Sequence, residues 1–360
     1  MERRWSIRTY EKGDEKGIFK LIKAVYPEKK YDWEKWIRGW NWMYMNNPIG
    51  DSKIWVADHN GKIVGSRSVF LVKIKIGNET IMASQNSGLM THPNYRRQGI
   101  FSTLEKKSFD QLKGDGIGIT YSFPSSMSYP IYMKSGLFFN IHALQTMIRP
   151  FNLENILKRR IKNKFLLKIY AVIGYLFINM FYRTKKPPEV DDLTISQISS
   201  FDDRINDFWK KISNDYEIMV IRNKEYLNWR YVDVPNVEYT IYLAEERGEI
   251  CGYIVLGCAE QDQLSGHIMD IIGPLNRPEI IHSLLSEAIK YFKEKKVDAI
   301  FCKMIADKIF YKIFRKNGFV PTRFITKSRF IVRINSPEIS EAYLKNKENW
   351  FIQLGDSDFI

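Results

Sequence analysis

The residues of this chain best suited to bind an anion are two adjacent arginines and a glycine between two apolar segments. Leu89 and Met90 end a short apolar run, and a helix-like pattern begins at Ile100 and reaches Leu112. A helix N-terminus offers unpaired N–H groups and the positive end of the helix dipole, glycine lets a phosphate approach the backbone, and arginine adds charge-assisted hydrogen bonds. The pattern predicts a phosphate-binding loop, with an ordinary turn before an amphipathic helix as the alternative. The candidate binding residues are Arg96, Arg97, Gln98, Gly99, Ile100, Phe101 and Ser102.

A tyrosine that could donate a proton lies further along the chain. Residues 117–123 are typical of a buried strand, closed by Pro124, and residues 125–137 of a short helix with a proline near its start and Gly136 past its end. Tyr132 lies in this helix, where its hydroxyl could act as a general acid. The alternative is a structural tyrosine whose ring packs and whose hydroxyl is capped.

Together, the loop and the tyrosine resemble the GNAT superfamily of N-acyltransferases. The acetyl-CoA loop of that family reads Arg/Gln-x-x-Gly-x-Gly/Ala, and residues 96–101 match it except that Phe101 replaces the small last residue. GNAT proteins place a tyrosine four residues before a glycine to protonate the leaving CoA thiolate, and Tyr132 holds this position before Gly136. The resemblance implies acetyl-CoA as acyl donor and an amine as acceptor. The donor-site residues that it implies are Leu89, Met90, Thr91, the loop residues 96–102 and Ser125.

The resemblance also implies a mechanism. The strand 82–91 should splay from the strand 117–123, so that the pantetheine arm of CoA pairs with the backbone of Leu89 and Thr91 like an added strand. A backbone N–H near Leu89 would stabilise the oxyanion while the amine attacks the thioester directly. No base is assigned. The nearest carboxylates to consider are Asp32 and Glu34, which also fit a solvated helix surface.

An internal repeat divides the chain into two halves. The segment 41–65 recurs at one offset as 228–252, each with Asn-Trp at its start and Ala, Gly, Ile and Gly at matching positions further on. The second copy has Pro278 and Glu279 in the place of the anion-binding loop, and Phe314 in the place of Tyr132. We therefore predict an α/β (α+β) protein with two GNAT folds in tandem, each a mixed, largely antiparallel twisted sheet flanked by helices. The expected domains are 1–150 (catalytic), 151–189 (helical linker), 190–335 (degenerate GNAT-like) and 336–360 (tail).

The linker between the halves is both basic and apolar. Residues 152–189 carry nine basic and two acidic side chains, a net of +7 against +14 for the whole chain. Between the basic flanks, residues 165–182 are apolar almost all round, and such a helix must be covered by protein or lipid. Three interpretations stay open: a helix buried against the domains, an interfacial anchor on an anionic membrane through residues 158–186, or a transmembrane span that is slightly short.

Composition indicates a soluble protein of the cytoplasm, since residues 1–12 are charged and lack a secretion signal. The cysteines have no metal-binding spacing and no zinc, haem or P-loop pattern occurs, so we expect no metal. Nucleic acid is a disfavoured partner, because no RNA-binding module is visible.

We therefore expect an acyl-CoA-dependent N-acetyltransferase acting on a primary amine, such as an amino-sugar or an envelope precursor. A clustered set of tryptophans (Trp33, Trp36 and Trp40 on one helical face) could stack on a sugar or simply pack in the core. A Fem-type aminoacyl transferase using charged tRNA and a non-catalytic GNAT-fold binding protein are the alternatives. The sequence does not identify the oligomeric state.

Overall fold

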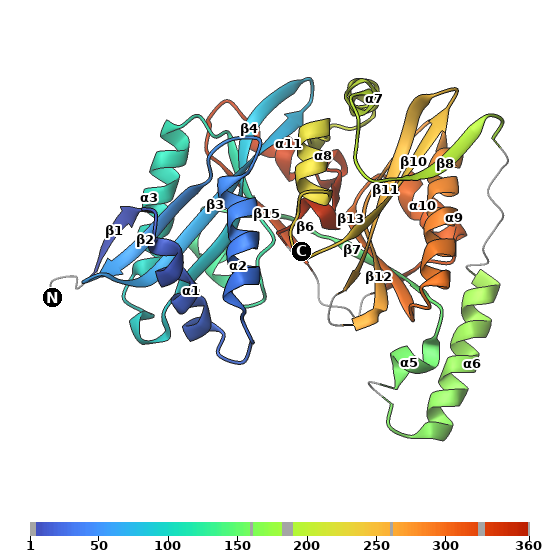
Figure 1. Ribbon diagram of the computed structural model, residues 1–360, viewed down its shortest axis with the longest axis horizontal. Coiled ribbons are helices and arrows are strands. Elements are labelled where there is room, and N and C mark those ends of the chain that lie inside the picture. The colour runs from blue at the N-terminus through green and yellow to red at the C-terminus, as the bar shows by residue number, and fades with distance from the viewer. Residues whose placement is uncertain (1–4, 159–160, 182–189, 260–261, 323–327, 359–360) are drawn as a thin grey trace. The chain divides into compact units, whose positions relative to one another are not determined.

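The computed structural model describes residues 5–158, 161–181, 190–259, 262–322 and 328–358 (Figure 1). The chain forms two compact units, each assembled from segments that are not contiguous in sequence. The first unit comprises residues 1–142, 233–236 and 329–346, and the second comprises residues 143–232, 237–328 and 347–360.

The first unit is built on one twisted sheet with the strand order β1-β2-β3-β4-β5-β15-β6. Neighbouring strands are antiparallel where the register is defined, except for the parallel pair β4 and β5. The strands are β1 (Ser6–Thr9), β2 (Lys53–His59), β3 (Lys62–Ile76), β4 (Glu79–Thr91), β5 (Ile119–Ser122), β6 (Phe139–Ala143) and β15 (Arg329–Ile334).

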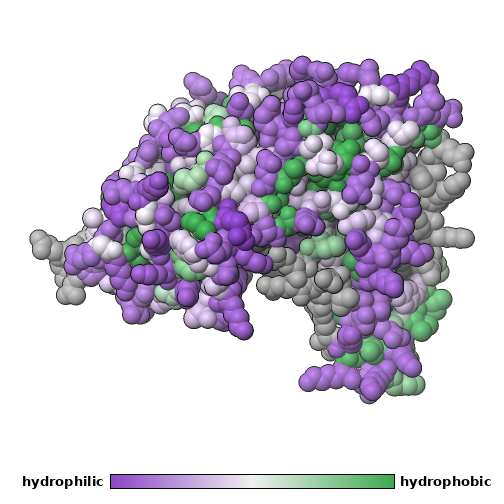
Figure 2. Space-filling model, in the orientation of Figure 1, coloured by the Kyte–Doolittle hydropathy of each residue, from purple (hydrophilic) through white to green (hydrophobic). Residues whose placement is uncertain are grey.

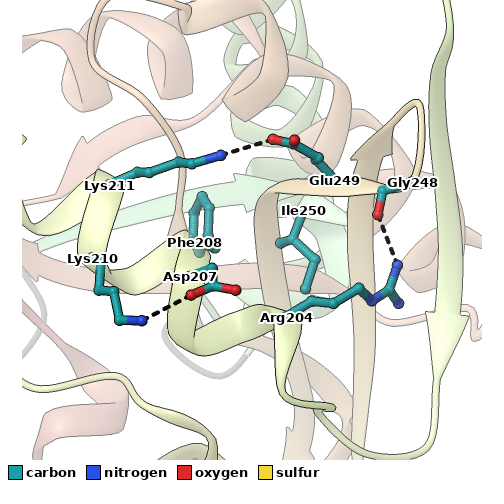
Figure 3. Close-up of a pocket in the computed structure, with 8 residues that line it drawn as sticks. All are labelled: Arg204, Asp207, Phe208, Lys210, Lys211, Gly248, Glu249 and Ile250. Atoms are coloured by element: carbon teal, nitrogen blue, oxygen red, sulfur yellow. Dashed lines mark hydrogen bonds and ion pairs between the residues drawn. The ribbon is translucent and has the colours of Figure 1, made fainter.

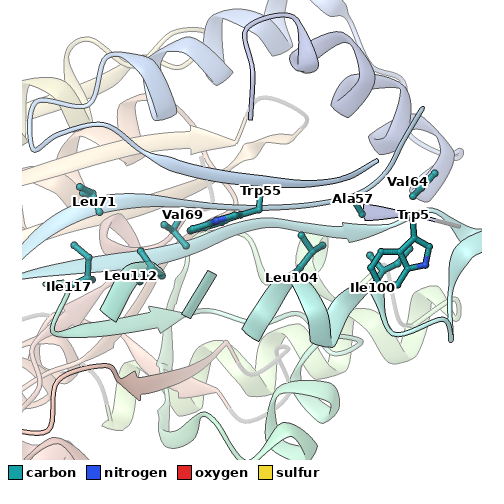
Figure 4. Close-up of a cluster of buried hydrophobic side chains, with 10 residues drawn as sticks. All are labelled: Trp5, Trp55, Ala57, Val64, Val69, Leu71, Ile100, Leu104, Leu112 and Ile117. Atoms are coloured by element: carbon teal, nitrogen blue, oxygen red, sulfur yellow. The ribbon is translucent and has the colours of Figure 1, made fainter. Parts of the chain in front are cut away.

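Helices cover this sheet and complete its core. They are α1 (Asp14–Val25), α2 (Trp33–Trp40) with a π-helical turn (Asn41–Met45), α3 (Ile100–Gly114), α4 (Tyr129–Ser135) and α11 (Glu341–Lys345). Between α3 and the sheet lies a cluster of fully or nearly fully buried apolar side chains, including Trp55, Val69, Ile100 and Leu104 (Figure 4). Gly65 allows this close packing, since a Cβ atom there would lie 2.6 Å from Cγ2 of Ile100. The position of the α3 N-terminus is thus fixed against β3.

The second unit repeats the arrangement with the strand order β14-β7-β13-β12-β11-β10-β8. The strands of this sheet are β7 (Gln145–Pro150), β8 (Leu193–Ile198), β10 (Tyr239–Glu246), β11 (Glu249–Ala259), β12 (Asp262–Ile272), β13 (Ala299–Ile305), β14 (Val320–Thr322) and β16 (Ile352–Gln353). The short strand β9 (Ile218–Val220) lies among the residues of this unit but is not part of this sheet. Its helices are α5 (Leu153–Leu157), α6 (Lys164–Phe181), α7 (Arg204–Ile212), α8 (Lys224–Tyr231), α9 (Pro278–Glu294) and α10 (Lys308–Lys316). Two tandem mixed sheets flanked by helices confirm the predicted fold class.

The internal repeat also holds at the level of strand register. In the first unit Ala57 pairs with Gly65, and in the second Ala244 pairs with Gly252. Both hairpins shift register directly after that alanine. A one-residue slip would move every following side chain to the other face of the sheet, so a shared irregularity is strong evidence for one repeated fold.

Each sheet receives a strand from the other half of the sequence. β15 pairs with β5 in the first sheet, and β7 pairs with β13 in the second. Residues 143–150 thus belong to the second compact unit and residues 329–346 to the first. The domain boundaries expected from the sequence, with GNAT-like domains at 1–150 and 190–335, stay a prediction.

The linker folds as a hairpin of α5 and α6. The Tyr175 hydroxyl donates to the Phe151 carbonyl at 2.7 Å and accepts from the Leu153 N–H at 3.0 Å, and Ala171 is buried. The opposite face of α6 is apolar and exposed, and hydrophobic side chains show on this hairpin at the lower right of Figure 2. The exposed residues include Phe165, Ile169, Val172, Ile173, Leu176 and Met180. The expectation that α6 is buried against the domains therefore does not hold for these exposed residues. Among the described helices, none is long and apolar enough to cross a membrane.

Candidate active site

The strands β4 and β5 pair over only part of their length. The parallel register runs from Ala83 opposite Ile119 to Gln85 opposite Tyr121. Past Gln85, β4 continues to Thr91 beside β3, while β5 pairs on its other side with β15. In this described part of the chain, one edge of residues 86–91 is therefore left without a neighbouring strand. The end of the pairing at Gln85 agrees with the splay predicted from the sequence.

A bulge at Gly88 shapes that free edge. Ser66 pairs with Met90 and Ser68 with Ser87, so β4 has one more residue than β3 across this step. Gly88 has φ +62°, a left-handed conformation that glycine adopts without steric cost, and its carbonyl accepts from the Ser66 hydroxyl at 3.0 Å. A bulge bends its strand and re-aims the following residues. Leu89 and its backbone are thereby turned relative to the regular part of β4.

The predicted anion loop caps α3 directly after β4. A 3-10 turn (Pro93–Tyr95) follows His92, and Gly99 is the N-cap of α3 with φ +84°. Arg97 is also left-handed, with φ +63°, which is uncommon for a residue other than glycine. Left-handed residues near a helix start turn successive N–H groups inward and form a concave anion site. Arg96, Arg97, Gln98, Gly99 and Ser102 are exposed, so a ligand can reach them.

Positive charge surrounds this loop. Burial lowers the pKa of His92, and the charges of Lys62 and Arg96 lower it further. The Lys62 ammonium also lies 5.9 Å from the centre of the Tyr95 ring. His92 is thus mostly neutral at pH 7 in a field that favours an anion. A diphosphate is a ligand of that kind.

Tyr132 lies near the end of β4 that leads into the anion loop. Its ring packs edge-on against Phe101, the second residue of α3, with the centroids 5.7 Å apart, and against Phe138 at 4.8 Å. Leu89 packs against the same cluster. The structure thus brings together Leu89, Phe101 and Tyr132, which the sequence separates. Phe101 departs from the small residue of the GNAT motif, and here its ring supports the tyrosine.

A buried hydrogen-bond chain fixes the polarity of the Tyr132 hydroxyl. Arg67 donates to Oδ1 of Asn86 at 2.8 Å, and Nδ2 of Asn86 donates to the Tyr132 hydroxyl at 3.2 Å. Because arginine can only donate, it must face the amide oxygen, so the amide nitrogen must face the tyrosine. The Tyr132 oxygen is therefore the acceptor in its bond with Asn86. A donor to the phenol oxygen also stabilises the phenolate that forms when a tyrosine gives up its proton.

This series of hydrogen bonds begins at a buried carboxylate on α3. Glu105 pairs with Arg67 and lies 3.5 Å from Nη1 of Arg333 on β15, and all three side chains are at most 4% exposed. Burial lowers the pKa of Arg333 to about 10, against the opposing effect of Glu105. The guanidinium nevertheless remains charged at neutral pH. Two buried cations share one carboxylate, and this electrostatic arrangement links α3, β3, β4 and β15 around the tyrosine.

Sequence reasoning missed this network. The signals were Arg67, the one charged residue within the buried run 63–72 of β3, and Glu105 on the buried face of α3, beside Leu104 and in line with Leu112. Nothing in their spacing linked the two. Arg67 and Glu105 are far apart in sequence, and they meet because α3 packs against β3.

The remaining predicted residues have mixed outcomes. Met90 is buried and Thr91 half-buried, and Ser125 lies in the turn before α4, where its carbonyl accepts from the Tyr129 N–H at 3.0 Å. Asp32 is the N-cap of α2 and accepts from the Lys35 N–H at 2.8 Å. It is exposed, as is Glu34. A helix cap accounts for Asp32, so the geometry gives no support to it as a catalytic base.

The second unit lacks the matching groups. Phe314, at the place of Tyr132, is fully buried, and α9 begins at Pro278, which has no N–H, followed by Glu279. Tyr311 on the same helix is engaged by the backbone, since its hydroxyl donates to the Met304 carbonyl at 3.1 Å. Burial raises its pKa to about 12.

A surface pocket of about 480 Å³ in the second unit lies elsewhere, between α7 and the β10–β11 turn (Figure 3). Ion pairs join Lys210 to Asp207 and Lys211 to Glu249 at its rim, and Arg204 reaches the Gly248 carbonyl. It does not lie where strands splay, so it is not the counterpart of the site in the first unit.

Comparison with known proteins agrees with this geometry. Residues 6–139 match the family model of the acetyltransferase (GNAT) domain. Residues 6–139 are thus a GNAT acetyltransferase domain. GNAT domains use acetyl-CoA as their acyl donor. No curated protein sequence gives a significant match.

Solved structures resemble nearly the whole chain. A probable N-acyltransferase from Enterococcus faecalis V583 has a TM-score of 0.64 at 13% identity, over 92% of this chain and 72% of that one. GCN5-related N-acetyltransferases from Anabaena variabilis and Kribbella flavida both have a TM-score of 0.60, at 11% and 8% identity, over 92% of this chain and 73% and 71% of theirs. At such identities the likeness shows the fold, and it extends over both GNAT-like sheets.

Proposed function

We propose that the first unit transfers an acetyl group from acetyl-CoA to the primary amine of an acceptor. The pyrophosphate binds at residues 96–102, and the pantetheine arm pairs with the free edge of β4 at Leu89 and Thr91. The amine attacks the thioester carbonyl, the C–S bond breaks, and Tyr132 gives its proton to the departing sulfur. The proton that the amine loses leaves through water, and the tyrosine is reprotonated from solvent. An N–H near Leu89 stabilises the oxyanion.

The observation that carries this proposal is the position of the Tyr132 hydroxyl. It is held by Asn86, a residue of the very strand edge that β5 leaves free, while its ring contacts the first turn of α3. An acyl-CoA that pairs with Leu89 and reaches the α3 N-terminus must pass this hydroxyl. The anion loop, the free strand edge and the proton donor are thus gathered at one end of β4, which supports this assignment of CoA's pyrophosphate, amides and sulfur.

Thiol release from acetyl-CoA in the presence of amino-sugars, polyamines and peptide amines tests the reaction. We expect release with at least one amine class, and none when the amine is acetylated beforehand. Calorimetry should give one acetyl-CoA per chain. Two per chain, or an unchanged affinity after Gly99→Val, would contradict the assignment to the first unit.

An aromatic ladder supports an amino-sugar, or a precursor of the cell envelope, as acceptor. Trp33, Trp36, Trp40 and Tyr44 follow one another with centroids 5.6, 5.0 and 4.5 Å apart. The Tyr44 hydroxyl donates to Oγ of Ser87 at 2.9 Å, directly before the Gly88 bulge. Trp33 and Trp36 are only half-buried, and aromatic faces stack on sugar rings. Trp36→Ala should therefore raise KM for an amino-sugar more than KM for acetyl-CoA.

The exposed face of α6 supports peripheral binding to an anionic membrane surface. Val172, Ile173 and Leu176 are 57%, 55% and 65% exposed, and Lys164 and Lys168 lie on the same helix. Water does not favour such a face, whereas a lipid interface accepts its apolar side chains and each nearby lysine or arginine adds ~1 kcal/mol on anionic lipid. Charge complementarity thus favours an anionic lipid surface, which on this proposal is the inner face of the membrane. A lipid-linked acceptor would be reachable there.

Sedimentation with phosphatidylglycerol-containing and phosphatidylcholine-only vesicles tests this surface. We expect pelleting with the anionic vesicles, reversed by salt, because exposed charges are screened. Leu176→Asp should weaken pelleting without lowering the melting temperature, since this side chain is already in water. Lys210→Asp, at an exposed site of α7, is the control. Absence of pelleting at low salt would refute membrane binding and leave the acetyl transfer untouched.

A further inference from the structure

The second unit contains the same strand splay as the first. β12 and β13 pair in parallel from Ser265 opposite Ala299 to Ile268 opposite Cys302. β12 then continues to Ile272 beside β11, and β13 continues to Ile305. A slot of the same kind is thus built into both GNAT folds.

Strand register identifies equivalent positions in the two slots. Gly65 pairs with Thr91 and Ser66 with Met90, whereas Tyr253, which follows Gly252, pairs with Ile272. Since Gly252 repeats Gly65, Ile272 corresponds to Met90. Ile271 therefore corresponds to Leu89, the residue whose backbone receives pantetheine in the proposed function.

In the second unit a segment of the chain itself occupies this position. β16 enters the splay and pairs antiparallel with β13, Gln353 lying opposite Met304 and Ile352 opposite Ile305. On the other side, the Gln353 side chain accepts from the Ile271 N–H at 3.1 Å and donates to the Ile271 carbonyl at 2.8 Å. Its amide thus makes the two bonds that an amide of a pantetheine arm would make with a strand edge. Gln353 is 1% exposed, so no room is left beside it.

Buried charges hold the segment in place. Arg222 donates to Asp270 on β12 at 3.0 Å and to both oxygens of Asp356 at 2.9 and 3.0 Å. Asp356 also accepts from the Gln353 N–H at 2.8 Å. All three charged side chains are at most 2% exposed. Removing one partner of such a group leaves an uncompensated charge in the interior, so the arrangement strongly favours the seated segment.

Gly355 makes the fit specific. A Cβ atom at this residue would overlap the Tyr231 hydroxyl and would lie 3.0 Å from the Met269 carbonyl. The Gly355 carbonyl accepts from Nε of Arg230 at 2.8 Å. A side chain at this position therefore requires Tyr231 or the segment itself to move from the observed conformation.

We propose that residues 350–357, the plug segment, are a built-in ligand of the second unit and occupy the slot that the pantetheine arm of acyl-CoA takes in the first. The inference rests on the proposed function for its comparison with Leu89. Its consequence is that the second unit is closed to acyl-CoA by occupation of the slot, in addition to lacking an anion loop. The plug segment fills the space between β12 and β13, and its side chains become part of the buried core of the second unit.

Hydrogen exchange on the full-length protein, with and without CoA, tests the proposal. We expect CoA to slow exchange in residues 86–91 and to leave residues 269–273 unchanged, because the Ile271 N–H is already bonded. Slower exchange in residues 269–273 on adding CoA would overturn the plug. If CoA slowed neither segment, the proposed function would fail, and the plug would be judged by the variants below.

Gly355→Ala tests the plug without CoA. Exchange in residues 269–273 should accelerate at least tenfold, while residues 86–91 stay unchanged. Gly355→Ala combined with Tyr231→Phe removes the overlapping hydroxyl and should recover part of the protection. Gly114→Ala, at a glycine whose Cβ would meet nothing within 4 Å, is the control. Wild-type exchange in residues 269–273 of the Gly355→Ala variant would refute the proposal. If the single variant did not fold, failure of the double variant to restore folding would equally count against it.

Discussion

Replacing Tyr132 by phenylalanine separates a catalytic hydroxyl from a structural one. The change removes one oxygen atom and keeps the ring, so the packing against Phe101 and Phe138 remains. The substitution removes the 3.2 Å hydrogen bond that Asn86 donates to the hydroxyl. A neutral hydrogen bond contributes about 1 kcal/mol, and an unsatisfied buried donor costs about 1–3 kcal/mol. We therefore expect unfolding free energy to fall by about 1–2 kcal/mol.

The effect on turnover should be larger. Loss of a general acid lowers turnover by about 10² to 10⁴, which corresponds to about 3–5 kcal/mol in the barrier. Affinity for acetyl-CoA should change little, since charge develops on sulfur only in the transition state. The assay is thiol release at saturating acetyl-CoA and amine, beside a denaturant titration of the same sample.

Tyr129→Phe is the matched control. Tyr129 lies on the same helix, with its ring over the Arg329 guanidinium at 4.0 Å, and its hydroxyl has no part in the proposed chemistry. The control should retain wild-type turnover within about twofold. If Tyr132→Phe did the same, the hydroxyl would be structural and water or another group would protonate CoA.

The sequence predicted local structure where local chemistry determines it. The loop with Arg96 and Gly99, the helix that starts after it, and the short helix between Pro130 and Gly136 all depend on turn and cap residues a few positions apart. The order of the elements also followed from the internal repeat, because a repeated pattern reports its own boundaries. These features needed no knowledge of distant contacts.

The sequence could not predict which half supplies each strand. β7 and β15 are both six-residue strands, and no residue within either of them specifies the sheet with which it pairs. The plug segment was likewise assigned to a tail, because nothing in its own sequence points to the distant sheet residues with which Gln353 and Asp356 pair. Its role depends on Ile271 and Arg222, which only the folded sheet brings to it.

The remaining predictions concern the donor loop and its buried support. Gly99→Val should weaken acetyl-CoA binding at least tenfold by calorimetry, because valine disfavours φ +84° and covers the N–H groups of α3. Glu105→Ala should lower the unfolding free energy by about 3–5 kcal/mol in urea, since it leaves two buried arginines without their carboxylate. His92 should take up protons when acetyl-CoA binds. Burial, Lys62 and Arg96 lower its pKa in the free protein, and a bound diphosphate offsets the positive field and raises that pKa again. Between the two pKa values the complex holds more protons than the free protein, so affinity should rise as the pH falls through this window. Calorimetry near pH 6 in buffers of different ionisation enthalpy measures this uptake, and His92→Gln should abolish it. Proton release, or uptake that survives in His92→Gln, would show that the diphosphate binds away from His92.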